Sequence, residues 1–143
     1  MVFRFAKTLD PITLFHSPSV PSSTRVLNIL KQASAAAEAE TVASKRGEFQ
    51  LEITTAPPTA DQLRNILDYV TANPAGASQN TVQYGVGEVI RGAKDAEDAV
   101  KRFKESGEGV FVRPITVDWT NGRAVVGDNE SEILKMVHQL DAN

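Results

Sequence analysis

The side chains best suited to chemistry stand together in one short stretch, HSPSVPSSTR, from His16 to Arg25. An apolar run precedes this stretch and an amphipathic pattern follows it, which predicts a strand, a turn and the start of a helix. The free amides and the dipole of a helix start attract anions. Three hydroxyl side chains there suit helix capping, namely Ser22, Ser23 and Thr24. With Pro21 in the first turn or in the approach to it, we expect an anion-attracting site to which Arg25 adds charge.

The same geometry would activate a thiol, because a helix start lowers the pKa of a cysteine placed there. The chain contains no cysteine. A serine nucleophile needs an adjacent base, and the two histidines, His16 and His138, are far apart in the sequence. We therefore expect no catalytic residue, no disulfide and no metal site.

Composition limits the classes of partner. A chain of 143 residues with 41% hydrophobic residues fits one globular domain over residues 1–143. The net charge of -3 and the pI of about 5.4 give no positive field for nucleic acid or an anionic membrane surface. We expect neither as a partner.

The N-terminal sequence, MVFRFAKTLD, is basic and amphipathic, and it is neither a secretory signal nor a membrane span. Two interpretations remain open for it. It is either an arm that packs on the sheet or a short mitochondrial import signal.

The first half of the chain alternates strand and helix patterns. An alanine-rich stretch over residues 32–48 follows the first helix, and its lack of large apolar side chains predicts an exposed insert. Phe49, Leu51 and Ile53 alternate with polar residues, as in a half-exposed strand for which an edge position is suitable. Thr59 then caps a second helix, and Gln62 completes the capping box.

The second half begins with a stretch of weak patterning. Residues 75–94 are expected to form a long glycine-containing loop, whose glycine spacing matches no nucleotide-binding motif. A helix is predicted over 95–106, and β residues at 110–112 and 115–117. Asn121-Gly122 predicts a two-residue hairpin turn. Asp128 or Asn129 then caps a last helix.

This order predicts an α/β fold with a four-stranded mixed sheet flanked by helices, because a βα crossover makes the first two strands parallel and a hairpin adds the last two.

Three stretches resemble a known group of proteins in colinear order. His16–Arg25 resembles the His-Asn-Pro-x-Cys-x-x-x-Arg loop of the glutaredoxin-linked arsenate reductases and the Spx regulators. Ala56–Leu63 resembles the Pro-Pro-Thr start of their second helix, and Val112–Leu134 their Arg-Pro-Ile strand, hairpin and last helix. The match is closer still to the fungal Found-in-Mitochondrial-Proteome-46 family of mitochondrial redox proteins.

The resemblance implies a thioredoxin-like fold and a set of site residues. In that fold a cis-proline precedes the third strand, which implies Pro114, and the neighbouring Arg113 would point toward the helix start. The implied ligand-binding residues are His16, Ser22, Ser23, Thr24, Arg25, Arg113 and Pro114. The cysteine of the reductases would fall on Val20 or on Pro21, because the loop has one extra residue.

Three functions follow from these observations. The first is a binding or adaptor module of the mitochondrial redox family, acting without thiol chemistry on a protein partner or a small anionic ligand. The second is an oxidoreductase that binds glutathione or an oxyanion and uses an external thiol. We expect no cofactor, with glutathione as the alternative. The third is an adaptor of transcription or proteolysis that is similar to Spx. The resemblance implies a mitochondrial location, with the cytoplasm as the alternative.

Overall fold

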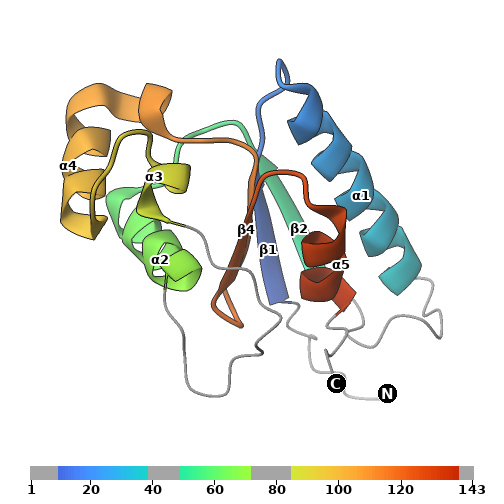
Figure 1. Ribbon diagram of the computed structural model, residues 1–143. Helices are drawn as coiled ribbons and strands as arrows, with labels where there is room; N and C mark the ends of the chain where they lie inside the picture. Colours follow the sequence, from blue (N-terminus) through green and yellow to red (C-terminus); the bar gives the residue numbers. More distant parts are fainter. Residues whose placement is uncertain (1–9, 39–48, 72–84, 139–143) are drawn as a thin grey trace, which may run out of the picture.

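The computed structural model describes residues 10–38, 49–71 and 85–138 of the chain. Strands and helices alternate along most of these ranges, as the α/β prediction requires (Figure 1). In chain order the elements are β1 (Asp10–Phe15), α1 (Pro21–Glu38), β2 (Phe49–Thr54), α2 (Ala60–Thr71), α3 (Val86–Val89), α4 (Ala96–Ser106), the 3₁₀ helix η1 (Gly107–Val110), β3 (Ile115–Asp118), β4 (Arg123–Val126) and α5 (Glu130–His138).

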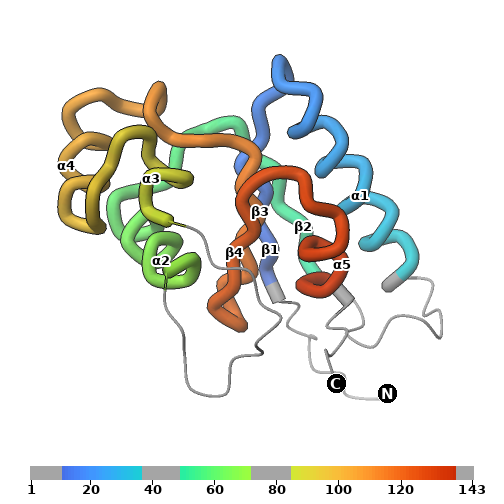
Figure 2. Tube along the Cα trace, in the orientation of Figure 1, coloured from blue at the N-terminus to red at the C-terminus, as the bar shows by residue number. Residues whose placement is uncertain are grey.

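The four strands form one mixed sheet in the order β2-β1-β3-β4 (Figure 2). β1 and β2 are parallel, in a register that pairs Phe15 with Thr54. β3 runs antiparallel to both β1 and β4. The predicted sheet is confirmed, and β2 lies at its edge.

Helices cover both faces of the sheet, with α1 and α5 on one face and α2, α3 and α4 on the other (Figure 1). Alternate residues of β1 divide between the two cores, because successive strand side chains point to opposite faces. Ile12 and Leu14 pack with the first pair of helices. Phe15 packs on the other face, in the core that includes Leu63 of α2 and Val100 of α4.

The helix caps follow the local sequence. The Thr59 hydroxyl accepts a hydrogen bond from the Gln62 amide at 3.1 Å, and the Gln62 side chain accepts one from the Thr59 amide at 3.0 Å. This reciprocal pair confirms the predicted capping box. Asp95 caps α4 through the Asp98 amide. Asn129, rather than Asp128, caps α5 by accepting from the Glu132 amide at 3.2 Å.

The structure differs from the expected pattern at two places in the second half. The described part of the expected loop over 75–94 contains the helical turn α3. The β residues at 110–112 do not belong to the hairpin strand, because Val110 ends η1 and Phe111 forms only an isolated bridge with Ile90. Val89 and Ile90 are both fully buried. Two apolar residues are too few to show the period of a helix or a strand, so the sequence pattern did not predict their burial. The elements that pack over them bury them.

The turn between β3 and β4 is longer than the predicted two residues. Asp118 and Arg123 form the last strand pair, which leaves a connection of residues 119–122. The Asp118 carboxylate accepts the amides of Thr120 and Asn121 and holds this turn. Gly122 closes it with a φ of 66°, a backbone conformation that glycine adopts at no steric cost.

The alanine-rich stretch over 32–48 is helical over its first part, because α1 continues to Glu38. Ala33 is buried there and Ala35 is exposed. Residues 39–48 lie outside the described ranges, as do residues 1–9, on which the two interpretations of the N-terminus depend. None of the helices in the described ranges is long and apolar enough to cross a membrane.

Candidate functional site

The candidate site lies where β1 passes into α1 and the chain enters β3. The Arg113–Pro114 peptide bond is cis, as the resemblance implied. The Pro114 carbonyl accepts a hydrogen bond from the Gly127 amide at 2.9 Å, and Gly127 immediately precedes Asp128. Because Asp128 contacts Arg25, this chain of contacts places Pro114 and Arg25 at the same end of the sheet.

The helix start differs from the prediction. α1 begins at Pro21, so Ser22, Ser23 and Thr24 lie in its first turn and are not N-caps. The Val20 carbonyl accepts the amides of Ser23 and Thr24 at 3.0 and 3.2 Å. Proline suits this first helical position, because the amide that it lacks would have no partner inside the helix.

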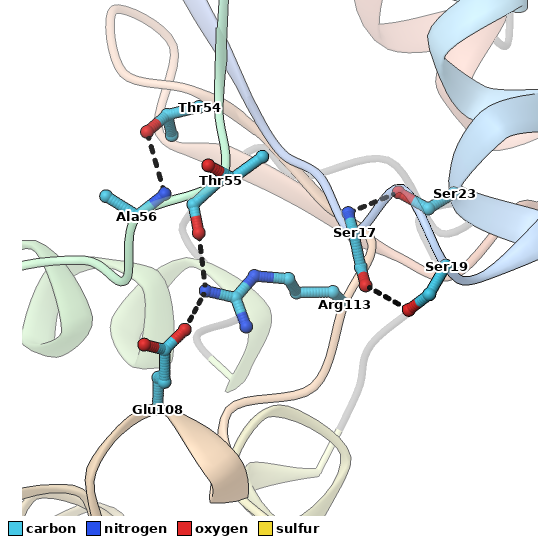
Figure 3. A network of polar contacts seen from close by, with 8 residues as sticks. All are labelled: Ser17, Ser19, Ser23, Thr54, Thr55, Ala56, Glu108 and Arg113. Atoms are coloured by element: carbon cyan, nitrogen blue, oxygen red, sulfur yellow. Dashed lines mark hydrogen bonds and ion pairs between the residues drawn. The ribbon is translucent and has the colours of Figure 1, made fainter.

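Ser23 and His16 form a buried pair. The Ser23 hydroxyl lies 2.6 Å from His16 Nδ1 and accepts the Ser17 amide at 2.9 Å. Ser23 is fully buried and His16 is 8% exposed. These contacts join the end of β1 to the first turn of α1, and Figure 3 shows the one between Ser17 and Ser23. A hydroxyl in this position stabilises the turn and is closed to a ligand from solvent.

The Ser17 and Ser19 hydroxyls, by contrast, are 3.3 Å apart on the outer side of the loop (Figure 3). Ser22 is partly exposed and Thr24 is exposed. Of the hydroxyl side chains predicted to bind a ligand, these two alone are open to solvent.

Arg25 already has an acidic partner. Its guanidinium donates to the Asp128 carboxylate at 2.6 Å, and the two side chains are 65% and 33% exposed. An ion pair this exposed contributes about 0–1 kcal/mol to stability, because solvent screens it. Arg25 therefore stays available to an anion that competes with Asp128.

Arg113 does not point toward the helix start, contrary to what the resemblance implied. Its Nη2 donates to the Thr55 carbonyl at 3.1 Å and to the Glu108 carboxylate at 3.2 Å. Figure 3 shows the side chain extending away from Ser17 and Ser23 toward these acceptors. The guanidinium also lies 5.4 Å from the centre of the Phe111 ring. Arg113 thus connects the segment after β2 to η1.

One donor of Arg113 is buried. The side chain is 12% exposed, and its Nε is buried without a hydrogen-bond partner among the described residues. A buried donor without a partner costs about 1–3 kcal/mol.

The residues that accept hydrogen bonds from the two arginines, Thr55, Glu108 and Asp128, are not among the predicted site residues. Asp128 was predicted only as a possible cap of the last helix, and no local pattern marked the other two. Each lies on a different element from its arginine, so only the folded chain brings them together.

The positions that match the reductase cysteine carry no thiol. Val20 and Pro21, the positions where the reductase cysteine would fall, stand at the start of α1 with side chains that cannot ionise. Over the ranges that the structure describes, no group of three His, Asp or Glu side chains could hold a metal ion.

Comparisons with known proteins agree with this fold. A solved arsenate reductase from Vibrio cholerae superposes with a TM-score of 0.57 over 90% of this chain and 98% of that chain, at 13% sequence identity. An identity this low shows the fold alone, which is thioredoxin-like. No curated protein matches the sequence. A family described as "Protein of unknown function (DUF1687)" matches residues 3–128, which is most of the chain. The protein therefore belongs to the DUF1687 family, on a thioredoxin-like fold.

Proposed function

We propose that this protein is a thioredoxin-like binding or adaptor module that performs no thiol chemistry. The observation that carries the proposal is the start of α1. Val20 and Pro21 stand where a thiol enzyme of this fold would have its nucleophile, and the chain has no cysteine elsewhere. The nearest hydroxyl that has a base beside it, Ser23, is fully buried against His16.

The exposed surface of this site suits binding. Pro18, Ser19 and Thr24 are exposed around the helix start, and Arg25 is held only by a solvent-exposed ion pair. The ligand that we propose is a segment of another protein or a small anion. The resemblance to the fungal redox family supports mitochondria as the compartment. Import of a tagged full chain, compared with a chain that lacks residues 1–9, tests that location.

A reductase assay tests the absence of catalysis. The purified full chain is incubated with glutathione and either a small disulfide or arsenate, and product formation is compared with a blank. We expect no turnover above the blank. Turnover that follows the protein concentration would overturn the proposal.

A cysteine introduced at the start of α1 tests whether the backbone amides there stabilise an anion. We expect Val20→Cys to give a thiol pKa of about 7 or lower, against about 8.5 for a free cysteine, because helix-start amides stabilise the thiolate. The matched control is Ala35→Cys, an exposed position near the other end of α1, where the pKa should stay near or above 8.5. Equal pKa values at both positions would show that the helix start has no such field. The pH dependence of thiolate absorbance measures both.

The exposed Arg25 beside the start of α1 favours a second candidate, an oxidoreductase that binds glutathione or an oxyanion and takes its thiol from outside. Thermal shift with glutathione, phosphate, sulfate and arsenate tests it. A ligand at ten times its Kd would stabilise the fold by about 1.4 kcal/mol. That stabilisation should disappear in Arg25→Ala and persist in Arg64→Ala, an exposed arginine of α2. A shift that survives Arg25→Ala would reject this candidate.

A further inference from the structure

The outer edge of β2 has a regular set of free backbone groups. Thr54 accepts the His16 amide at 2.8 Å, so its backbone faces β1. In a parallel ladder alternate residues face the same neighbour. The amides and carbonyls of Phe49, Leu51 and Ile53 therefore point away from β1. β2 is the terminal strand of the sheet, and no backbone bond from a described residue outside the sheet reaches these groups.

Among the described residues, this edge lacks the features that most often block pairing. Natural edge strands are protected by lysine, proline, bulges or a covering element. β2 is six residues long, FQLEIT, and contains no lysine, proline or glycine. Ile53 is 42% exposed and is the one large hydrophobic side chain that is exposed among the described residues.

We propose that β2 pairs with β2 of a second copy of this chain, antiparallel, about a two-fold axis at Leu51. In this register Leu51 lies opposite Leu51 of the second copy, and Phe49 lies opposite Ile53. The outward backbone groups then match, because opposite residues of this kind exchange two hydrogen bonds in an antiparallel ladder. The pairing is isologous, since one surface binds itself.

The side chains of β2 are complementary in the same register. Phe49 and Leu51 point to the face covered by α1 and α5, so Ile53 extends that apolar face across the axis. On the other face, exposed Gln50 lies opposite exposed Glu52 of the second copy, an amide donor facing a carboxylate acceptor. The two-fold axis repeats this contact between Glu52 of the first copy and Gln50 of the second. A register shifted by one residue would place Leu51 opposite Glu52 of the second copy. The apolar face of one sheet would then continue into the polar face of the other.

Self-association of β2 does not depend on the proposed function, since it uses the edge of the sheet and none of the residues at the start of α1. Sedimentation of the full chain over a concentration range up to about 0.5 mM measures it, and we expect a reversible dimer. Ile53→Lys should weaken the dimer at least tenfold, because it places a charge on the paired edge. Gln32→Lys, an exposed change on α1 with the same charge, should leave the dimer unchanged.

Two variants with charges of opposite sign at position 50 test the register of the proposed β2 pairing. Gln50→Lys places a cation opposite Glu52 of the second copy and should tighten the dimer about two- to fivefold, whereas Gln50→Glu should weaken it by a similar factor. Circular dichroism confirms that each variant is folded. A monomer at every concentration, or a dimer that none of the β2 variants affects, would overturn the proposal.

A single cysteine gives a direct test of the axis, because the parent chain contains none. Residues paired across the axis have Cα atoms about 5.5 Å apart, which is within the range of a disulfide. Under mild oxidation Leu51→Cys should give a covalent dimer. Ala35→Cys, an exposed position on α1, should stay monomeric under the same conditions. Equal crosslinking of the two variants would show random collision and overturn the proposed axis.

Discussion

Replacing Ser23 by alanine separates a structural role for this hydroxyl from a role in ligand binding. The change removes the hydrogen bonds to the Ser17 amide at 2.9 Å and to His16 Nδ1 at 2.6 Å. Each hydrogen bond contributes about 0.5–1.5 kcal/mol, and a buried group left without a partner costs about 1–3 kcal/mol. His16 is 8% exposed, so little water can replace the hydroxyl. Alanine recovers roughly 0.5 kcal/mol as the better helix former.

We therefore expect Ser23→Ala to lower the free energy of unfolding by about 1–3 kcal/mol. For a domain of this size that loss lowers the thermal midpoint by roughly 3–10 °C. Urea unfolding followed by circular dichroism measures the change. The control is Ser22→Ala in the same helical turn, which should change stability by less than about 0.5 kcal/mol because Ser22 is partly exposed. Equal stabilities for the two variants would refute a structural role for the Ser23–His16 pair.

Three further predictions concern contacts in other parts of the fold. Thr59→Ala should cost about 0.5–2 kcal/mol in urea unfolding, because it removes half of the capping box of α2; an unchanged stability would show that water replaces the cap. Trp119→Phe should cost about 0.5–1.5 kcal/mol, because Trp119 Nε1 donates to the Thr13 hydroxyl at 2.9 Å, and a double-mutant cycle with Thr13→Val should show coupling between the two residues. The hydrogen bond from Arg102, and then that from the Lys94 amide, hold the pKa of Asp98 below its usual 3.8. Asp98→Asn should therefore reduce stability at neutral pH, and its difference from the parent should shrink as the pH falls below 3.8. A difference that is constant from neutral to acidic pH would contradict this reasoning.

Features that depend on neighbouring residues could be predicted from the sequence. The capping box of Thr59 and Gln62 forms within one helical turn. The alternation at Phe49, Leu51 and Ile53 marks a strand because its period is two. The order of these elements then limits the topology, since crossovers make neighbouring strands parallel and hairpins make them antiparallel.

Features that depend on distant residues could not be predicted. α3 is a single helical turn, too short to show a period, and Ile90 is ordered by its bridge to Phe111. Ser22, Ser23 and Thr24 are equally good caps by residue type, yet α1 already begins at Pro21, before all three. Ser23 is the buried hydroxyl because the end of β1 places His16 beside it.

The sequence by itself determined that the chain supplies no thiol of its own, because that conclusion needs only the lack of cysteine. It also determined the alternation of strands and helices, because periodicity is a local property. The tertiary structure decided the partners of the two arginines. Arg25 pairs with Asp128 across 103 positions of the chain, and Arg113 bonds Thr55 across 58. Contacts between residues so far apart depend on how the helices and loops pack at the end of the sheet, and no local pattern encodes that packing.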